Sequence, residues 1–108
     1  MKQFQLGVVI ATRELSRTDG GTVLIEIGCP QSDTDLGWFV PYRITGIGDS
    51  RISRGASSVD AIYALQMTLM KIGIDLIGIN KYNPGILTCE LENWGFPVPR
   101  DIIDSMSG

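Results

Sequence analysis

Residues 57–78 read SSVDAIYALQMTLMKIGIDLIG, and this stretch decides the fold. Its apolar residues recur at spacings of three and four, which is the period of an α-helix. Ser57 stands at the start, where a hydroxyl can cap a helix, and Asp60 lies near the positive end of the helix dipole. The stretch therefore predicts one long amphipathic helix that opens at Ser57 and runs to about Gly78.

A step of about 100° per residue divides this helix into three faces. The face predicted to pack on a sheet carries five aliphatic residues, Ile62, Leu65, Leu69, Ile72 and Leu76. The opposite face is predicted to be in water and carries Asp60, Ala64, Thr68, Lys71 and Asp75. A third face, which we call the methionine stripe, flanks the wet one and consists of Tyr63, Met67, Met70 and Ile74.

Three arrangements would account for the methionine stripe. The C-terminal tail folds over it, the core wraps far round the helix, or a partner protein or second copy of the chain covers it. Methionine is flexible and polarizable, and it is common at adaptable interfaces. The candidate interface is therefore the methionine stripe together with Asp60 and Asp75.

Upstream of the helix, apolar and polar residues alternate, which is typical of strands with one buried face. Residues 4–10 and 22–27 flank a glycine-containing turn at 17–21 and are predicted to pair as a β-hairpin. Residues 38–47 form the next predicted strand, in which Pro41 indicates an edge position or a bulge.

A turn at Gly48 and Asp49 leads into a shorter polar strand over residues 51–56. Beyond the helix, residues 86–91 are predicted to form a strand and residues 100–106 a short helix. The predicted fold class is α+β. An antiparallel sheet of four to five strands packs on the one long helix, in the order ββββαβ, and a C-terminal tail follows.

The composition argues against several function classes. The chain of 108 residues carries 9 basic residues, 12 acidic residues and no histidine, and a single domain over residues 1–108 is expected. The net charge of −3 falls wholly within residues 57–108, and it argues against nucleic-acid binding, which needs clustered Lys and Arg. The missing histidine removes the commonest general base and the commonest metal ligand.

The sequence also bears on location and catalysis. The N-terminal apolar stretch is too short for a signal peptide, and no apolar run approaches the roughly 20 residues of a membrane span. A cytoplasmic protein without membrane association is therefore expected, in which Cys29 and Cys89 are reduced and buried. No nucleophile motif or metal-ligand spacing is present, so we expect no enzyme activity, no cofactor and no metal.

Three arginines form the one basic cluster, Arg43, Arg51 and Arg54. They either make a salt-bridged face of the sheet or hold an acidic partner or a phosphate group. Arg43 and Arg51 are expected to lie nearly opposite each other across the turn. Trp38 and Tyr42 are expected near the mouth of a pocket between the sheet and the helix.

Several blocks of the sequence resemble one family. They are similar to a family of small bacterial proteins of unknown function. The blocks are residues 38–49 (WFVPYRITGIGD), the helix block around residues 64–66 (ALQ) and the closing residues 94–97 (WGFP). That resemblance supports the fold and implies no catalytic residue. The order of strands and helix also resembles that of HicB-like antitoxins, which bind a toxin protein.

The expected function is that of a noncatalytic protein-binding module, such as a bacterial immunity protein or an antitoxin. Small size, acidity and the methionine stripe favour this hypothesis. Two alternatives stay open. One is a small-molecule-binding domain with a pocket between sheet and helix. The other is a homo-oligomeric structural domain, such as a homodimer in which a second copy takes the place of a foreign partner.

Overall fold

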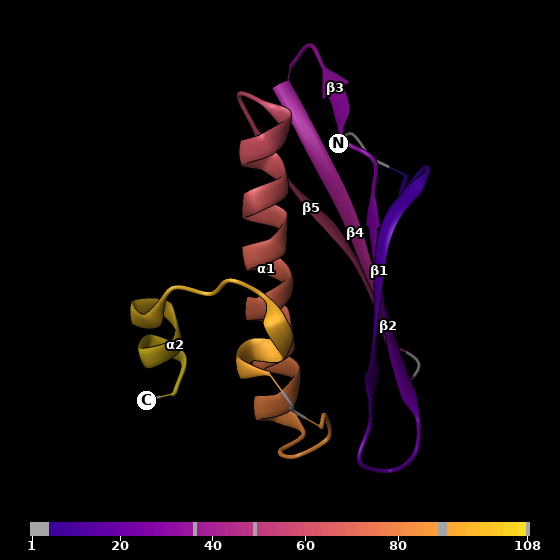
Figure 1. The fold of residues 1–108 in the computed structure, drawn as a ribbon, viewed down its shortest axis with the longest axis vertical. Coiled ribbons are helices and arrows are strands. Elements are labelled where there is room, and N and C mark those ends of the chain that lie inside the picture. The colour runs from indigo at the N-terminus through magenta and orange to yellow at the C-terminus, as the bar shows by residue number, and fades with distance from the viewer. Residues whose placement is uncertain (1–4, 36, 49, 89–90, 108) are drawn as a thin grey trace.

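The computed structural model describes residues 5–35, 37–48, 50–88 and 91–107 (Figure 1). Five strands come first: β1 (Val9–Ser16), β2 (Thr22–Gly28), β3 (Gln31–Asp33), β4 (Gly37–Ile47) and β5 (Ser50–Ser58). They are followed by the long helix α1 (Ala61–Tyr82), the short 3-10 helix η1 (Glu92–Gly95) and α2 (Arg100–Ser107). All strand pairs are antiparallel, and the predicted α+β class is confirmed. Residue 4 of the first predicted strand, Asp49 of the predicted turn and Cys89 lie outside the described residues.

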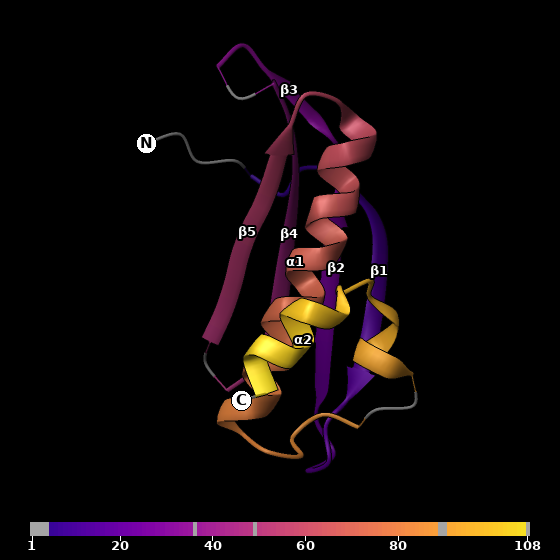
Figure 2. The ribbon, with the colours of Figure 1, turned by 90° about the vertical axis from the view of Figure 1, so that its left-hand side faces the viewer.

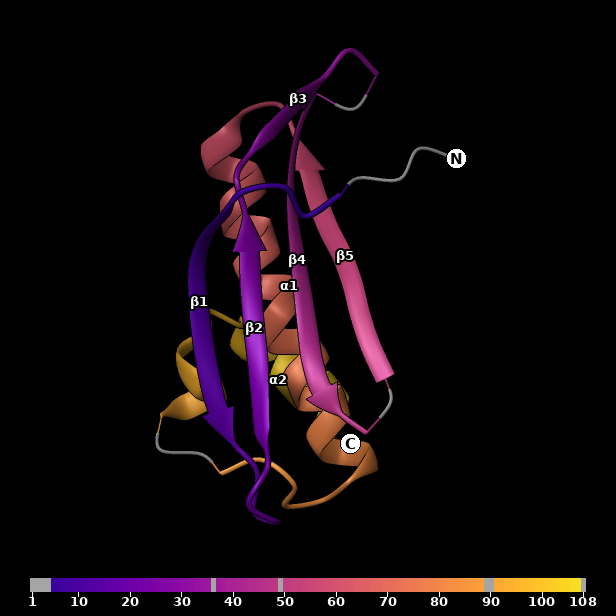
Figure 3. The same ribbon diagram turned by 90° about the vertical axis from the view of Figure 1, so that its right-hand side faces the viewer.

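The sheet has β4 near its centre, with β2 and β3 along one side and β5 along the other (Figure 3). Ile27 lies opposite Tyr42, whereas Gln31 lies opposite Phe39. The chain from β2 to β3 therefore holds one residue more than the part of β4 that it faces, so the extra residue lies in that chain and not in β4. Pro41 lies in this part of β4, between the ladder with β2, which ends at Tyr42, and the ladder with β3, which begins at Phe39. On its other side it pairs in register with Gly55 of β5, so the bulge expected in this strand is not at Pro41.

The first and the last of the predicted strands differ from the structure. The first begins later than expected, at Val9, and its expected buried face is wrong because Val8 and Ile10 are exposed. β1 lies at the edge of the sheet, whereas α1 packs on β4 and β5. The strand expected after the helix is reduced, within the described residues, to one antiparallel bridge between Arg17 and Leu87.

The long helix starts and ends later than the sequence predicts. Ser57 belongs to β5, and Asp60 is the N-cap, because its carboxylate accepts a hydrogen bond of 2.7 Å from the Tyr63 N–H. The helix continues past Gly78 to Tyr82. By length and apolar composition α1 would suffice to cross a membrane, whereas the sequence analysis expects no membrane span. Core helices of soluble domains are often as long and as apolar.

Part of the face of α1 predicted to be wet lies against the sheet, whereas Asp60 and Lys71 of that face are exposed as predicted. Ala64 and Thr68 are completely buried, whereas Ile62, predicted to face the sheet, is 73% exposed. Small side chains allow the helix to approach the strands closely. The Thr68 hydroxyl is satisfied there, because it donates to the Val40 carbonyl at 2.7 Å and accepts from the Ala56 N–H at 3.2 Å.

Other residues of α1 pack against two different parts of the molecule, the sheet and the C-terminal tail. Ile72 and Leu76 are buried in the core, as predicted. Gly73 faces the C-terminal tail, and a Cβ atom at Gly73 would lie 2.3 Å from a methyl carbon of Val98. Figures 1 and 2 show the result, in which the sheet lies on one side of α1 and the predicted short helix, α2, lies on another. The molecule therefore has three layers.

A left-handed turn fixes the tail to the edge of the sheet. Asn93 and Trp94 have positive φ values of 52° and 56°, which side chains rarely adopt. The Trp94 indole donates to the Thr88 carbonyl at 3.0 Å, and the Trp94 carbonyl accepts from Arg13 of β1 at 2.8 Å. Arg13 also lies over the ring of Phe96, 4.8 Å from its centroid. The tail is thus part of the core and not a loose extension.

Candidate functional site

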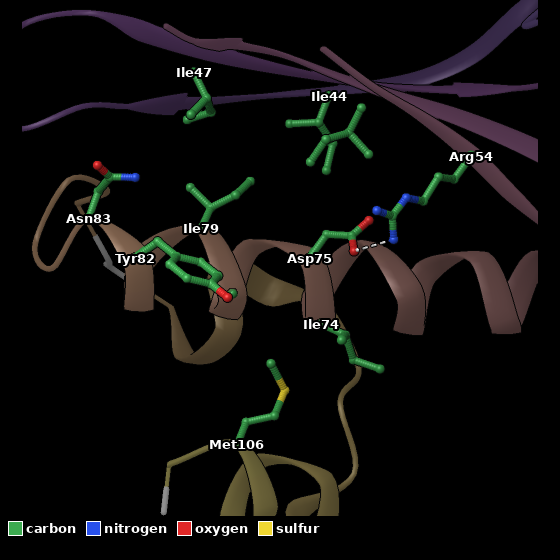
Figure 4. A pocket seen from close by; sticks show the side chains of 11 residues that line it. Ile44, Ile47, Arg54, Ile74, Asp75, Ile79, Tyr82, Asn83 and Met106 are labelled. Carbon is green, nitrogen blue, oxygen red and sulfur yellow. Dashed lines mark hydrogen bonds and ion pairs between the residues drawn. The ribbon is translucent and has the colours of Figure 1, made fainter. Parts of the chain in front are cut away.

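A cleft of about 470 Å³ opens between the sheet and the C-terminal half of α1. Figure 4 shows side chains from β4, β5, α1 and α2 pointing into it. Its apolar walls consist of Ile44, Ile47, Ile52, Ile74, Ile79 and Met106. Four groups carry polar atoms at its borders, and they are Arg54, Asp75, Tyr82 and Asn83. The cleft is therefore mainly apolar, with charge confined to one part of it.

A bulge in β4 places Ile47 in the cleft. Thr45 lies opposite Arg51, but Ile47 lies opposite Ser50, so Gly46 is an extra residue in β4. Without it, Ile44 and Ile47 would point to opposite faces of the sheet, because side chains alternate along a strand. Gly46 has a φ of 101°, and a Cβ atom there would lie 2.2 Å from the Thr22 carbonyl oxygen. Only glycine fits this position.

A missing side chain on α1 gives the cleft part of its room. Gly78 lines the cleft, and no heavy atom lies within 4 Å of the position that its Cβ would occupy. Glycine inside a helix costs about 1 kcal/mol relative to alanine. No neighbouring atom in the folded structure requires a glycine at this position. The open space beside Gly78 is part of the cleft.

The charged end of the cleft is a network of three side chains. The Asp75 carboxylate, 13% exposed, accepts a hydrogen bond from the hydroxyl of the buried Tyr42. It also pairs with Arg54, whose guanidinium nitrogen lies 3.4 Å away (Figure 4). Burial and then the hydrogen bond to Asp75 raise the pKa of Tyr42 well above its usual value of 10.0. The phenol therefore stays protonated and neutral.

The other end of the cleft is open to solvent. The Tyr82 side chain at its rim is 86% exposed. Met106 of α2 forms the side facing away from the sheet, as Figure 4 shows. The Lys81 ammonium donates to the Met106 carbonyl at 2.7 Å and so fastens α2 to the end of α1.

The structure separates the members of the predicted interface. Tyr63 is 52% exposed, Met67 and Met70 are half-buried, and Ile74 lines the cleft beside Met106. The methionine stripe is therefore covered by α2 at its C-terminal end. Asp60 is exposed as the helix cap, whereas Asp75 points to the sheet.

The predicted arginine cluster is divided between the two faces of the sheet. Arg43 lies opposite Ser53 and not Arg51, and it forms a salt bridge of 2.8 Å with Glu26 on the face away from α1. Arg51 is exposed on that same outer face, opposite Thr45. Arg54 alone lies opposite Tyr42, on the face towards α1. Only Arg54 therefore contributes to the cleft.

The two aromatic residues predicted for a pocket mouth also have different places. Trp38 lies at the far end of β4, opposite Ser58, and does not line the cleft. Tyr42 reaches the cleft through Asp75. The prediction of a buried thiol is wrong for Cys29, which is exposed. Within the described parts of the chain, no three Cys, Asp or Glu side chains gather in a way that would hold a metal ion.

Comparison with known proteins places this fold in a family. A family model described as a domain of unknown function (DUF6968) matches residues 11–99. No curated protein and no solved structure matches the chain significantly. The match runs from β1 to the residue before α2 and includes every lining residue of the cleft except Met106. The expectation of a family of unknown function is confirmed at this level, and the similarity to HicB-like antitoxins stays a prediction. Since the match covers most of the sequence, the chain belongs to the DUF6968 family of domains of unknown function.

Proposed function

We propose that the domain is a noncatalytic binding module that holds a small, mainly apolar molecule in the cleft between the sheet and α1. The observation that carries the proposal is the cleft itself. Its volume of about 470 Å³ falls within the range of about 300–1,000 Å³ that is usual for ligand sites. Apolar walls with a few convergent polar groups are the usual composition of such sites.

The state of the polar groups supports binding over catalysis. Among the described residues that line the cleft, Asp75 is the one carboxylate, and it already has two donors, Tyr42 and Arg54. Tyr42 keeps its proton because its pKa is raised. A general base must be unprotonated and must reach a substrate proton. Tyr42 is protonated, and Asp75 is mostly buried and already holds two hydrogen bonds.

The test fills the space at Gly78. We expect a neutral apolar fluorophore, N-phenyl-1-naphthylamine, to bind the wild-type chain with increased fluorescence. Gly78→Leu places a side chain in the cleft and should weaken binding about tenfold or more, since the probe loses the contacts of about two methylene groups. Gly78→Ala is the matched control, because it adds one carbon and favours the helix. Equal binding by all three proteins, or no binding by the wild type, would contradict the proposal.

A second candidate function is the protein-binding one, and a separate surface favours it. Val59 and Ile62 at the N-terminal end of α1 are 87% and 73% exposed, and Tyr63 beside them is half exposed. Exposed apolar groups that gather in this way are typical of protein interfaces. We infer a basic toxin as the partner, because Asp60 and the acidic C-terminal half supply the opposite charge. The candidate fails if the chain neither binds nor neutralises a toxin encoded beside it.

A further inference from the structure

We propose that the ligand of the cleft is a single-chain aliphatic carboxylate, whose head group is bound by Arg54 and whose chain lies among the isoleucines. This inference rests on the proposed small-molecule function and names the class of ligand. It follows from the distribution of unused hydrogen-bonding capacity, from the local charge and from the length of the apolar walls.

Arg54 has capacity to spare. A guanidinium group has five N–H donors in a planar fork that fits a carboxylate with two parallel hydrogen bonds. Arg54 uses this group for one contact, with Asp75, at 3.4 Å, which is long for a charged hydrogen bond. Its side chain is 62% exposed. A carboxylate at the cleft can therefore gain a pair of charged hydrogen bonds without breaking a strong one.

Asp75 is much less accessible to a ligand than Arg54. Its side chain is 13% exposed and accepts from both Tyr42 and Arg54. Lys71 lies one helical turn before Asp75, and its ammonium donates to the carbonyl of Gly55, next to Arg54 in β5. Arg54 and Asp75, the charged residues that line the cleft, sum to zero, and Lys71, which lies outside the lining, brings the local charge to +1. An anionic head group is therefore favoured over a cationic one.

The apolar walls set the size of the rest of the ligand. Ile44 and Ile52 lie opposite each other on the sheet, and Ile79 of α1 faces them across the cleft (Figure 4). Asp75 and Tyr82 are seven residues apart, which is about 10 Å along the helix axis and matches an extended chain of about eight or nine carbons. Each methylene group buried there should strengthen binding by up to about fourfold.

The test compares three ligands that differ only in the head group. Decanoate, 1-decanol and decylamine compete with N-phenyl-1-naphthylamine for the wild-type chain. We expect decanoate to bind about tenfold or more tightly than 1-decanol, because a hydrogen bond to a charged group outweighs one between neutral groups by that factor. Decylamine should be the weakest of the three. This comparison needs no variant and so does not depend on how a mutant folds.

Substitutions then assign the head-group site. Arg54→Gln should reduce the affinity for decanoate to that of 1-decanol and leave 1-decanol unchanged. Arg54→Lys should restore part of the preference, because it keeps the charge and loses the fork. Arg51→Gln is the matched control, since Arg51 lies on the same strand but on the outer face of the sheet.

The outcomes separate the two proposals. Equal affinities for decanoate and 1-decanol in the wild type overturn the carboxylate assignment and leave the small-molecule function standing. A preference for decylamine likewise overturns it and points to Asp75 as the head-group partner. If Arg51→Gln loses as much affinity for decanoate as Arg54→Gln, the attraction is general and the site is not at Arg54. If the fluorophore and all three ligands fail to bind, the proposed function fails as well.

Discussion

Asp75 connects the interior of the domain with its cleft. It is a carboxylate on the side of α1 that packs on the sheet, and it is tolerated there because Tyr42 and Arg54 both donate to it. The Tyr42 hydroxyl in turn is buried and has this carboxylate as its acceptor. Each group thus satisfies the other, and the pair orders the charged end of the cleft.

The Tyr42–Asp75 hydrogen bond predicts how stability depends on pH. The pKa of Tyr42 is raised in the folded state, so the folded protein holds this proton more tightly than the unfolded chain, whose value is about 10.0. The contribution is therefore complete below pH 10 and is lost as the pH rises above it, by at most about 1.4 kcal/mol per pH unit.

Urea unfolding of the wild type and of Tyr42→Phe at several pH values measures this effect. The difference between the two proteins should be constant in neutral solution and should shrink above pH 10, where only the wild type has this phenol to ionise. Tyr63 and Tyr82 are present in both proteins and cancel. Parallel curves across the alkaline range would show that the Tyr42 proton is not held as described.

At the scale of elements, Thr68 fastens α1 to two strands. Its hydroxyl donates to Val40 of β4 and accepts from Ala56 of β5. Thr68→Val keeps the shape but leaves a buried carbonyl and a buried N–H without this partner. We expect a loss of about 2–6 kcal/mol in the free energy of unfolding, since each of the two groups costs about 1–3 kcal/mol.

Thr68→Ser is the control for this prediction. It keeps the hydroxyl and removes one methyl group, which costs about 1 kcal/mol. Chemical denaturation should therefore rank the valine variant below the serine variant in stability. The opposite order would mean that Val40 and Ala56 pair with each other directly once the hydroxyl is gone.

The helix itself could be predicted from its sequence, but not the orientation of its faces. Periodicity locates Ile72 and Leu76 in the core correctly. It fails for Ala64 and Thr68, because a count of large apolar residues gives no weight to small ones that allow close approach. It leaves the C-terminal tail as one of three candidate covers for the methionine stripe, whereas Gly73 shows that the tail does pack on the helix. The existence of the tail contact depends on tertiary structure that local spacing does not contain.

The strands show a similar limit. Alternation predicts β2, β4 and the hairpin turns, because one face of each central strand is buried. In the sequence, the bulge at Gly46 is visible only as a glycine within a strand. Such a glycine is typical of bulges, but it does not indicate which side chain will change to the other face of the sheet. Its carbonyl accepts from Arg17 at 2.7 Å, a contact between residues 29 positions apart. That contact is not visible in the local pattern.

At the scale of the whole molecule, the cleft exists where three layers meet. The sheet contributes Ile44 and Ile52, α1 contributes Ile74 and Ile79, and α2 contributes Met106. The sequence predicts a sheet on a helix and hence a pocket between them. It does not predict which end opens, because that depends on the bulge in β4, on the missing side chain in α1 and on where the tail places α2.

The most direct test of the ligand cleft is a methyl NMR titration of the isoleucines with decanoate. The chain carries isoleucines both inside and outside the cleft, so one spectrum contains the site and its controls. The cleft residues are Ile44, Ile47, Ile52, Ile74 and Ile79. The controls are Ile10 and Ile62, which are exposed, and Ile25, which is buried away from the cleft.

We predict that the methyl signals of the five cleft isoleucines shift together and saturate, while those of Ile10, Ile25 and Ile62 stay in place. A cleft that binds no apolar ligand would leave all of these signals unchanged. Shifts confined to Ile62 would place binding at the exposed end of α1 instead, and either result would contradict the account.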